Sequence, residues 1–106
     1  MNIDELFKKL PGAFKADAAQ GMDVTIQFNI SEPRHVVIKD SKLTVNSGTA
    51  PSPSLAMNIA DSDLVGMMTG TIEGMTLFMT GKLTIDGDMM LAQRMGGIFD
   101  QSKLSA

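Results

Sequence analysis

Residues 22–30, with the sequence MDVTIQFNI, alternate strictly between apolar and polar side chains. Successive side chains of an extended strand point to opposite faces, so every apolar side chain from Met22 to Ile30 would lie on one face. The stretch therefore predicts a β-strand with one buried side and one side in water.

Two further strands are expected at residues 34–39 and 43–45, after short turns at residues 31–33 and 40–41. Such short connections favour an antiparallel meander. Beyond a polar, turn-rich crossover at residues 46–53, alternation resumes at Leu55, Met57 and Ile59, and a fifth strand is expected around Leu83 and Ile85.

Helical spacing appears between these strands. Asn2 is expected to cap an opening helix that Pro11 ends or kinks, Asp61 to cap a second helix that ends at Gly70, and Asp88 to cap the last one. The expected helices cover residues 3–10, a short turn at 16–19, and residues 61–70, 72–80 and about 89–101. The order of elements predicts a single α+β domain over residues 1–106, with two layers. Its five-stranded, mostly antiparallel sheet has helices over one face.

Composition excludes several kinds of function. The 106 residues include no cysteine and one histidine and carry a formal net charge of −3. Disulfides and thiolate sites are therefore excluded, and we expect no metal, no cofactor and no nucleic-acid partner. The acidic N-terminus does not resemble a secretory signal, and the uncharged stretch at 43–60 is too rich in polar residues and proline to span a membrane.

Candidate catalytic groups are few. His35 has no neighbouring nucleophile or carboxylate signature and is interpreted as a surface or strand-edge residue. The acid pairs Asp61/Asp63 and Asp86/Asp88 flank strand-to-helix junctions, where carboxylates suit helix N-termini. We therefore expect no catalytic residues and no enzymatic activity.

Methionine is the unusual residue. Seven of the ten methionines fall between residues 67 and 95, on or beside expected helices. Methionine is flexible and specifies a tight core poorly, so this layer favours an adaptable apolar pocket over ordinary core packing. Gly96 and Gly97 are unusual inside a helix. Two explanations are equally good: the glycines allow close packing, or they leave room for a ligand or for movement of the last turn.

The run from Phe78 to Ala92, FMTGKLTIDGDMMLA, resembles the C-terminal signature of the sterol carrier protein type 2 domain family. Residues 6–11, 26–30, 36–40 and 60–70 resemble other parts of that domain, in the same order. The resemblance implies a five-stranded sheet, helices over one face and a hydrophobic tunnel between the two layers. It also implies non-catalytic binding or transfer of fatty acyl, fatty acyl-CoA or sterol-like ligands.

Carried over position by position, the resemblance implies a tunnel lining drawn from the first strand and from three helices. The expected ligand-binding residues are Ile26, Phe28, Leu64, Met67, Met68, Met75, Phe78, Met79, Leu91, Met95, Ile98 and Phe99. A polar group such as Gln27 or Gln93 is a candidate for orienting a ligand head group.

Two alternatives stay open on partners and place. The domain either carries a lipid and contacts membranes transiently, or presents a lipophilic intermediate, such as a quinone precursor, to partner enzymes. Relatives in eukaryotes commonly end in a peroxisomal tripeptide, whereas here residues 102–104, Ser-Lys-Leu, are followed by two more residues. Because that signal is read only at the extreme C-terminus, we expect a cytoplasmic location.

Overall fold

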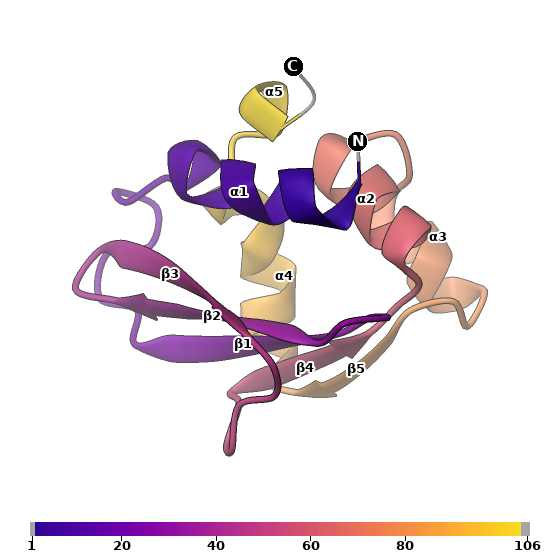
Figure 1. The fold of residues 1–106 in the computed structure, drawn as a ribbon, viewed down its shortest axis with the longest axis horizontal. Helices are drawn as coiled ribbons and strands as arrows, with labels where there is room; N and C mark the ends of the chain where they lie inside the picture. The colour runs from indigo at the N-terminus through magenta and orange to yellow at the C-terminus, as the bar shows by residue number, and fades with distance from the viewer. Residues whose placement is uncertain (1, 105–106) are drawn as a thin grey trace.

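The computed structural model describes residues 2–104, in which five strands form a single sheet (Figure 1). The strands are β1 (Val24–Asn29), β2 (Arg34–Lys39), β3 (Lys42–Ser47), β4 (Leu55–Asn58) and β5 (Thr84–Gly87). Their order is β3-β2-β1-β4-β5; β1 and β4 run parallel, whereas the other three neighbouring pairs run antiparallel. The predicted α+β class and mostly antiparallel sheet are confirmed. Met1 and residues 105–106, on which the expected location depends, lie outside the described residues.

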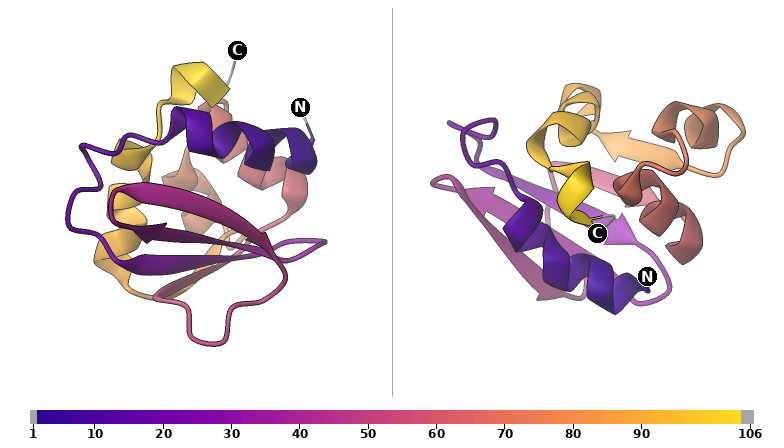
Figure 2. Two further views of the ribbon diagram at one scale, coloured as in Figure 1. Left: turned by 60° about the vertical axis from the view of Figure 1, so that its left-hand side comes forward. Right: turned by 90° about the horizontal axis from the view of Figure 1, so that it is seen from above.

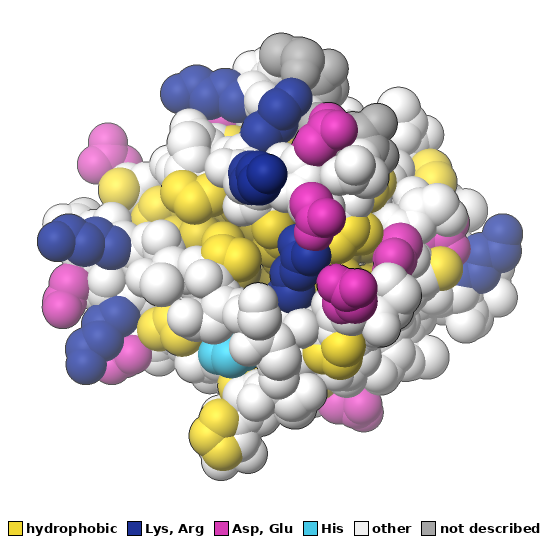
Figure 3. All heavy atoms as spheres, in the orientation of Figure 1, with side chains coloured by type: hydrophobic (Ala, Val, Ile, Leu, Met, Phe, Trp, Pro, Cys, Tyr) yellow, Lys and Arg dark blue, Asp and Glu magenta, His cyan; other side chains and the backbone are white. Residues whose placement is uncertain are grey.

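The described helices are α1 (Ile3–Ala13), α2 (Asp61–Thr69), α3 (Gly74–Met79), α4 (Met89–Ile98) and α5 (Gln101–Leu104). Figures 1 and 2 show α1, α2 and α5 over one face of the sheet. The apolar side chains of β1 point toward these helices, and Ile26 and Phe28 are fully buried there with Leu6 and Leu10 of α1. On the face seen in Figure 3, acidic and basic side chains are interspersed, without a broad area of one sign.

Helix ends follow local hydrogen bonds. The Asn2 side chain accepts a bond from the backbone N–H of Glu5 at 2.8 Å, and Asp88 accepts bonds from Met90 and Leu91 at the start of α4. Both predicted caps are therefore confirmed. The prediction that α1 ends or kinks at Pro11 is wrong about the end, because the helix continues to the buried Ala13. Residues 16–19 form turns and not the expected piece of helix.

The expected last helix is divided in two. Phe99 has an extended backbone, with φ −122° and ψ 139°, and forms an isolated antiparallel bridge with Phe14. Backbone bonds from Lys15 to Ile98 (2.7 Å) and from Asp100 to Ala13 (2.8 Å) hold this bridge in place. The chain therefore leaves the helical path after Ile98 and resumes it in α5.

Gln27 is buried on the opposite face of the sheet from Ile26 and Phe28, and only 1% of its surface is exposed. Its Oε1 accepts a bond from the Ala50 N–H at 2.8 Å, and its Nε2 donates to the Gly48 carbonyl at 3.4 Å. The amide therefore holds the crossover between β3 and β4 against the sheet. The suggestion that Gln27 orients a ligand head group is wrong, because these bonds place it away from the helical layer.

Asp61 connects α2 to the end of β1 and does not cap its helix as expected. The N-cap is Ala60, and the Asp61 carboxylate instead accepts hydrogen bonds from the Ser31 backbone N–H, at 2.9 Å, and from the Ser31 hydroxyl. The hydroxyl bond, followed by the backbone bond, lowers the pKa of Asp61, and the charge of Arg34 adds to this.

A lowered pKa in the folded state means that the carboxylate stabilises the fold above its unfolded pKa of about 3.9. This stability is lost as the pH falls through the lower, folded pKa. We expect Asp61→Asn to lower the free energy of unfolding at pH 7 by on the order of 1 kcal/mol, since the bonds are charge-assisted but largely exposed. The difference from the parent chain should shrink at pH 3, as measured by urea unfolding. Asp63→Asn is the matched control, and an equal loss for Asp61→Asn at both pH values would contradict the assignment.

Candidate functional site

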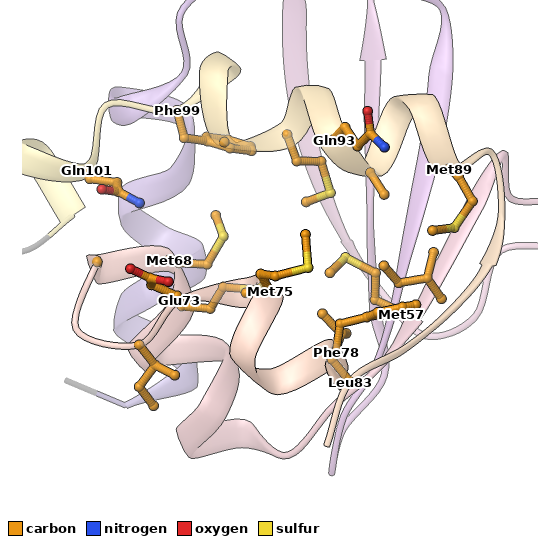
Figure 4. Close-up of a pocket in the computed structure, with 18 residues that line it drawn as sticks. Met57, Met68, Glu73, Met75, Phe78, Leu83, Met89, Gln93, Phe99 and Gln101 are labelled. Atoms are coloured by element: carbon orange, nitrogen blue, oxygen red, sulfur yellow. The ribbon is translucent and has the colours of Figure 1, made fainter. Parts of the chain in front are cut away.

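A cavity of about 520 Å³ lies between the α2–α3 segment, α4 and the strands β4 and β5 (Figure 4). Its walls are mostly thioether and hydrocarbon. The lining residues are Met57, Met67, Met68, Gly70, Ile72, Glu73, Gly74, Met75, Phe78, Leu83, Ile85, Met89, Ala92, Gln93, Met95, Gly96, Phe99 and Gln101. The methionine-rich layer therefore leaves a hollow beside the strands instead of closing on them.

The faces of α4 explain part of this hollow. Leu91, Met95 and Ile98 follow helical spacing and are buried, and of these three only Met95 also lines the cavity. On the face of the helix beside them, four more residues line the cavity: Met89, Ala92, Gln93 and Gly96. Because small side chains stand at the middle of this face, the helix cannot fill the space beside it.

The glycine pair in α4 was open to two interpretations. A Cβ atom built at Gly96 or Gly97 would meet no other atom within 4 Å. Close packing therefore does not explain the pair. Gly96 lines the cavity and leaves room at its wall.

The structure brings together six of the twelve expected ligand-binding residues. These six line the cavity: Met67, Met68, Met75, Phe78, Met95 and Phe99. Five others, at most 4% exposed, pack in the core and do not line it: Ile26, Phe28, Leu64, Leu91 and Ile98. Met79, at the end of α3, is 78% exposed and also does not line it.

The lining includes residues that sequence reasoning did not select. Met57 and Ile85 come from β4 and β5, Leu83 from the residue just before β5, and Met89 from the start of α4. Their alternation along the strands was visible in the sequence. Their position at the cavity depended on the pairing of β4 with β5, which brings Met57 opposite Ile85.

The polar side chains of the lining are Glu73, Gln93 and Gln101. Within residues 2–104, Glu73 is the only ionisable residue that lines the cavity. The catalytic candidates considered from the sequence do not line the cavity. His35 is on β2, with its Nδ1 3.1 Å from the Gly48 carbonyl oxygen. The acid pairs Asp61/Asp63 and Asp86/Asp88 are also absent from the lining.

Two other structural features are absent from the described part of the chain: a metal-binding cluster and a membrane-spanning helix. Residues 2–104 hold no group of three His, Asp or Glu side chains that could bind a metal ion. None of their helices combines the length and apolar character needed to cross a bilayer.

The fold and cavity define a two-layer α+β domain with an apolar pocket, and comparison with known proteins identifies its family. Residues 3–100 match the SCP-2 sterol transfer family. The chain belongs to this family, and the resemblance drawn from its sequence is confirmed.

Curated relatives agree with this assignment. The chain is 37% identical over 95 residues to Sterol carrier protein 2 of Bos taurus, which covers 87% of this chain and 16% of the relative. It is 28% identical over 101 residues to Peroxisomal multifunctional enzyme A of Dictyostelium discoideum, covering 94% of this chain and 21% of the relative. The chain thus spans between 16% and 25% of the length of these and similar relatives.

Solved structures share the fold. The apo form of Sterol Carrier Protein 2 from Yarrowia lipolytica matches with a TM-score of 0.70 at 23% identity, covering 96% of this chain and 88% of that one. Sterol Carrier Protein-2 from Aedes aegypti, in complex with palmitate, matches with a TM-score of 0.71 at 15% identity, covering 89% and 90%. A structure described as UbiJ-SCP2 Ubiquinone synthesis protein matches with a TM-score of 0.66 at 14% identity, covering 87% and 79%.

Proposed function

We propose that this chain binds a lipid with a long apolar tail in the methionine-lined cavity and carries it without chemical change. The observation that supports this most directly is the cavity itself. Its volume of about 520 Å³ falls within the range of small-molecule sites, and its lining is mostly apolar. Fatty acyl, fatty acyl-CoA and sterol-like compounds are the candidate ligands of this family.

The energetics of burial support such a ligand. An alkyl tail of about 15 methylenes, at ~0.8 kcal/mol each, offers roughly 12 kcal/mol of gross transfer free energy. Lost translational and conformational freedom cancels a large part of this gain. Micromolar affinity is therefore reachable without a charged anchor, and flexible methionines allow the walls to repack around different tails.

The chemistry of the lining argues for binding over catalysis. In the described residues it holds no serine, threonine, histidine or lysine side chain, so a nucleophile paired with a base is not present at the cavity. The six expected residues that line the cavity, Met67, Met68, Met75, Phe78, Met95 and Phe99, are the ones that we propose contact the ligand tail.

A second function is presentation of a lipophilic intermediate to partner enzymes. It is supported by the similarity of fold to the structure described as UbiJ-SCP2 Ubiquinone synthesis protein. In that case the chain should co-purify with biosynthetic enzymes, whereas a free carrier should exchange ligand passively between vesicles.

The test of lipid binding is native mass spectrometry of the purified chain, followed by solvent extraction and displacement of a neutral fluorescent probe. We expect a co-purified lipid or displacement by a fatty alcohol, fatty acid or acyl-CoA at micromolar concentration. A chain that carries no lipid and responds to none of these compounds would contradict the proposed function.

A further inference from the structure

Two of the three polar side chains that line the cavity, those of Glu73 and Gln101, lie at the same end. Figure 4 shows Glu73 at this end with Gln101, whereas the other end is mainly apolar, with Met57, Phe78, Leu83 and Met89. The third polar residue, Gln93, lies on α4 on that side, near Met89. Glu73 precedes α3, and Gln101 begins α5. The binding free energy of a lipid would be most favourable with its tail among the methionines and its head group beside Glu73 and Gln101.

The polar end carries negative charge. The Glu73 side chain is exposed, caps no backbone N–H group of α3 and takes part in none of the ion pairs found among residues 2–104. No lysine or arginine of the described chain lines the cavity. Lys103, two residues beyond Gln101, acts on Asp100, whose pKa is lowered mainly by its bond to the Ser102 hydroxyl and further by this lysine. A carboxylate at this end would therefore meet Glu73 without a cation among the lining residues.

We propose that Glu73 makes the cavity select lipids with an uncharged, hydroxyl-bearing head group over lipids that end in a carboxylate. This inference rests on the proposed function and specifies its ligand class. A hydroxyl can donate to the Glu73 carboxylate and accept from the Gln101 amide, so both polar groups at this end find a partner. A carboxylate has no proton to donate and is repelled by Glu73, the more so because the apolar walls exclude water from one side.

The test compares 1-dodecanol with laurate, two ligands that share a twelve-carbon chain, by displacement of a neutral fluorescent probe at pH 7.5 and low salt. The two head groups differ in hydration, so the decisive quantity is how the ratio of their affinities changes on substitution. We expect Glu73→Gln to raise the affinity for laurate about fivefold while the affinity for dodecanol stays within twofold. Glu5→Gln, which removes the same charge from α1 away from the cavity, should change neither affinity.

The outcomes separate this inference from the function beneath it. If both ligands bind but their affinity ratio is the same in Glu73→Gln and the parent chain, Glu73 does not select the head group and the inference fails alone. If Glu5→Gln raises the affinity for laurate as much as Glu73→Gln does, the effect comes from net charge, and this result would also overturn the inference. If neither ligand displaces the probe from the parent chain, both the proposed function and the inference that rests on it are contradicted.

Discussion

Met95→Trp is expected to abolish most of the lipid binding while leaving the fold intact. Met95 is 6% exposed, lies on α4 and lines the cavity, so a larger, rigid indole at this position would occupy space meant for the ligand tail. Displacing about four methylenes of a bound tail, at ~0.8 kcal/mol each, costs about 3 kcal/mol, or roughly a hundredfold in affinity. Extra volume in a packed core destabilises by about 1–3 kcal/mol, and the hollow should keep the cost at the low end.

Met79→Trp is the matched control for this experiment. Met79 is also a methionine of the helical layer, but it is 78% exposed and does not line the cavity. Its substitution should leave the affinity for a fatty acid or alcohol within twofold, as measured by probe displacement alongside circular dichroism. Equal binding by the two variants and the parent chain would show that the ligand does not occupy this cavity.

Gly87→Ala is expected to cause the largest loss of stability, about 2–4 kcal/mol. Gly87 has a φ of +107°, which side chains rarely adopt, and a Cβ atom there would lie 2.5 Å from the carbonyl oxygen of Ser54. That oxygen accepts the hydrogen bond of the Asp88 N–H at 3.0 Å, where α4 begins. Backbone strain and steric overlap each cost about 1–3 kcal/mol, and both act here on the junction between β5 and α4.

Urea unfolding measures the loss, with Gly97→Ala as the control. Gly97 is inside α4, and a Cβ atom there would meet nothing within 4 Å, so alanine should raise the free energy of unfolding by up to about 1 kcal/mol. A free energy of unfolding for Gly87→Ala within 0.5 kcal/mol of the parent would show that the chain avoids the overlap at little cost.

The strands could be predicted from the sequence because their signals are local. Alternation at residues 22–30 predicts β1, found at Val24–Asn29, and Met22 and Ile30 just beyond it are still buried. The turn at Asp40 and Ser41 is also confirmed, and both residues take positive φ, as a two-residue hairpin requires.

The helix boundaries depended on distant contacts. Phe99 leaves the helical path because it bridges Phe14, which is far away in the sequence. Asp61 accepts a hydrogen bond from the backbone N–H of Ser31, just after β1, instead of capping its own helix. Nothing in the sequence within a few residues of either position reveals these partners. Local patterns therefore predicted that the last helix continues past Phe99 and that Asp61 caps its own helix.

The candidate site could be predicted as a region but only partly by residue. The density of methionines indicated where the cavity lies. The most apolar face of α4, with Leu91 and Ile98, however, packs in the core, and the cavity takes the adjacent face with Ala92, Gln93 and Gly96. An unfilled space is bordered by small and polar residues as well as large ones, so hydrophobic periodicity selects the wrong face of such a helix.

Within residues 2–104, every residue that lines the cavity comes from Met57 or later in the chain, whereas the β1–β2–β3 meander and α1 contribute none. The cavity lining can therefore be varied without changing the first half of the chain. Libraries confined to residues 57–101 can alter ligand preference while the first half is kept constant as a scaffold.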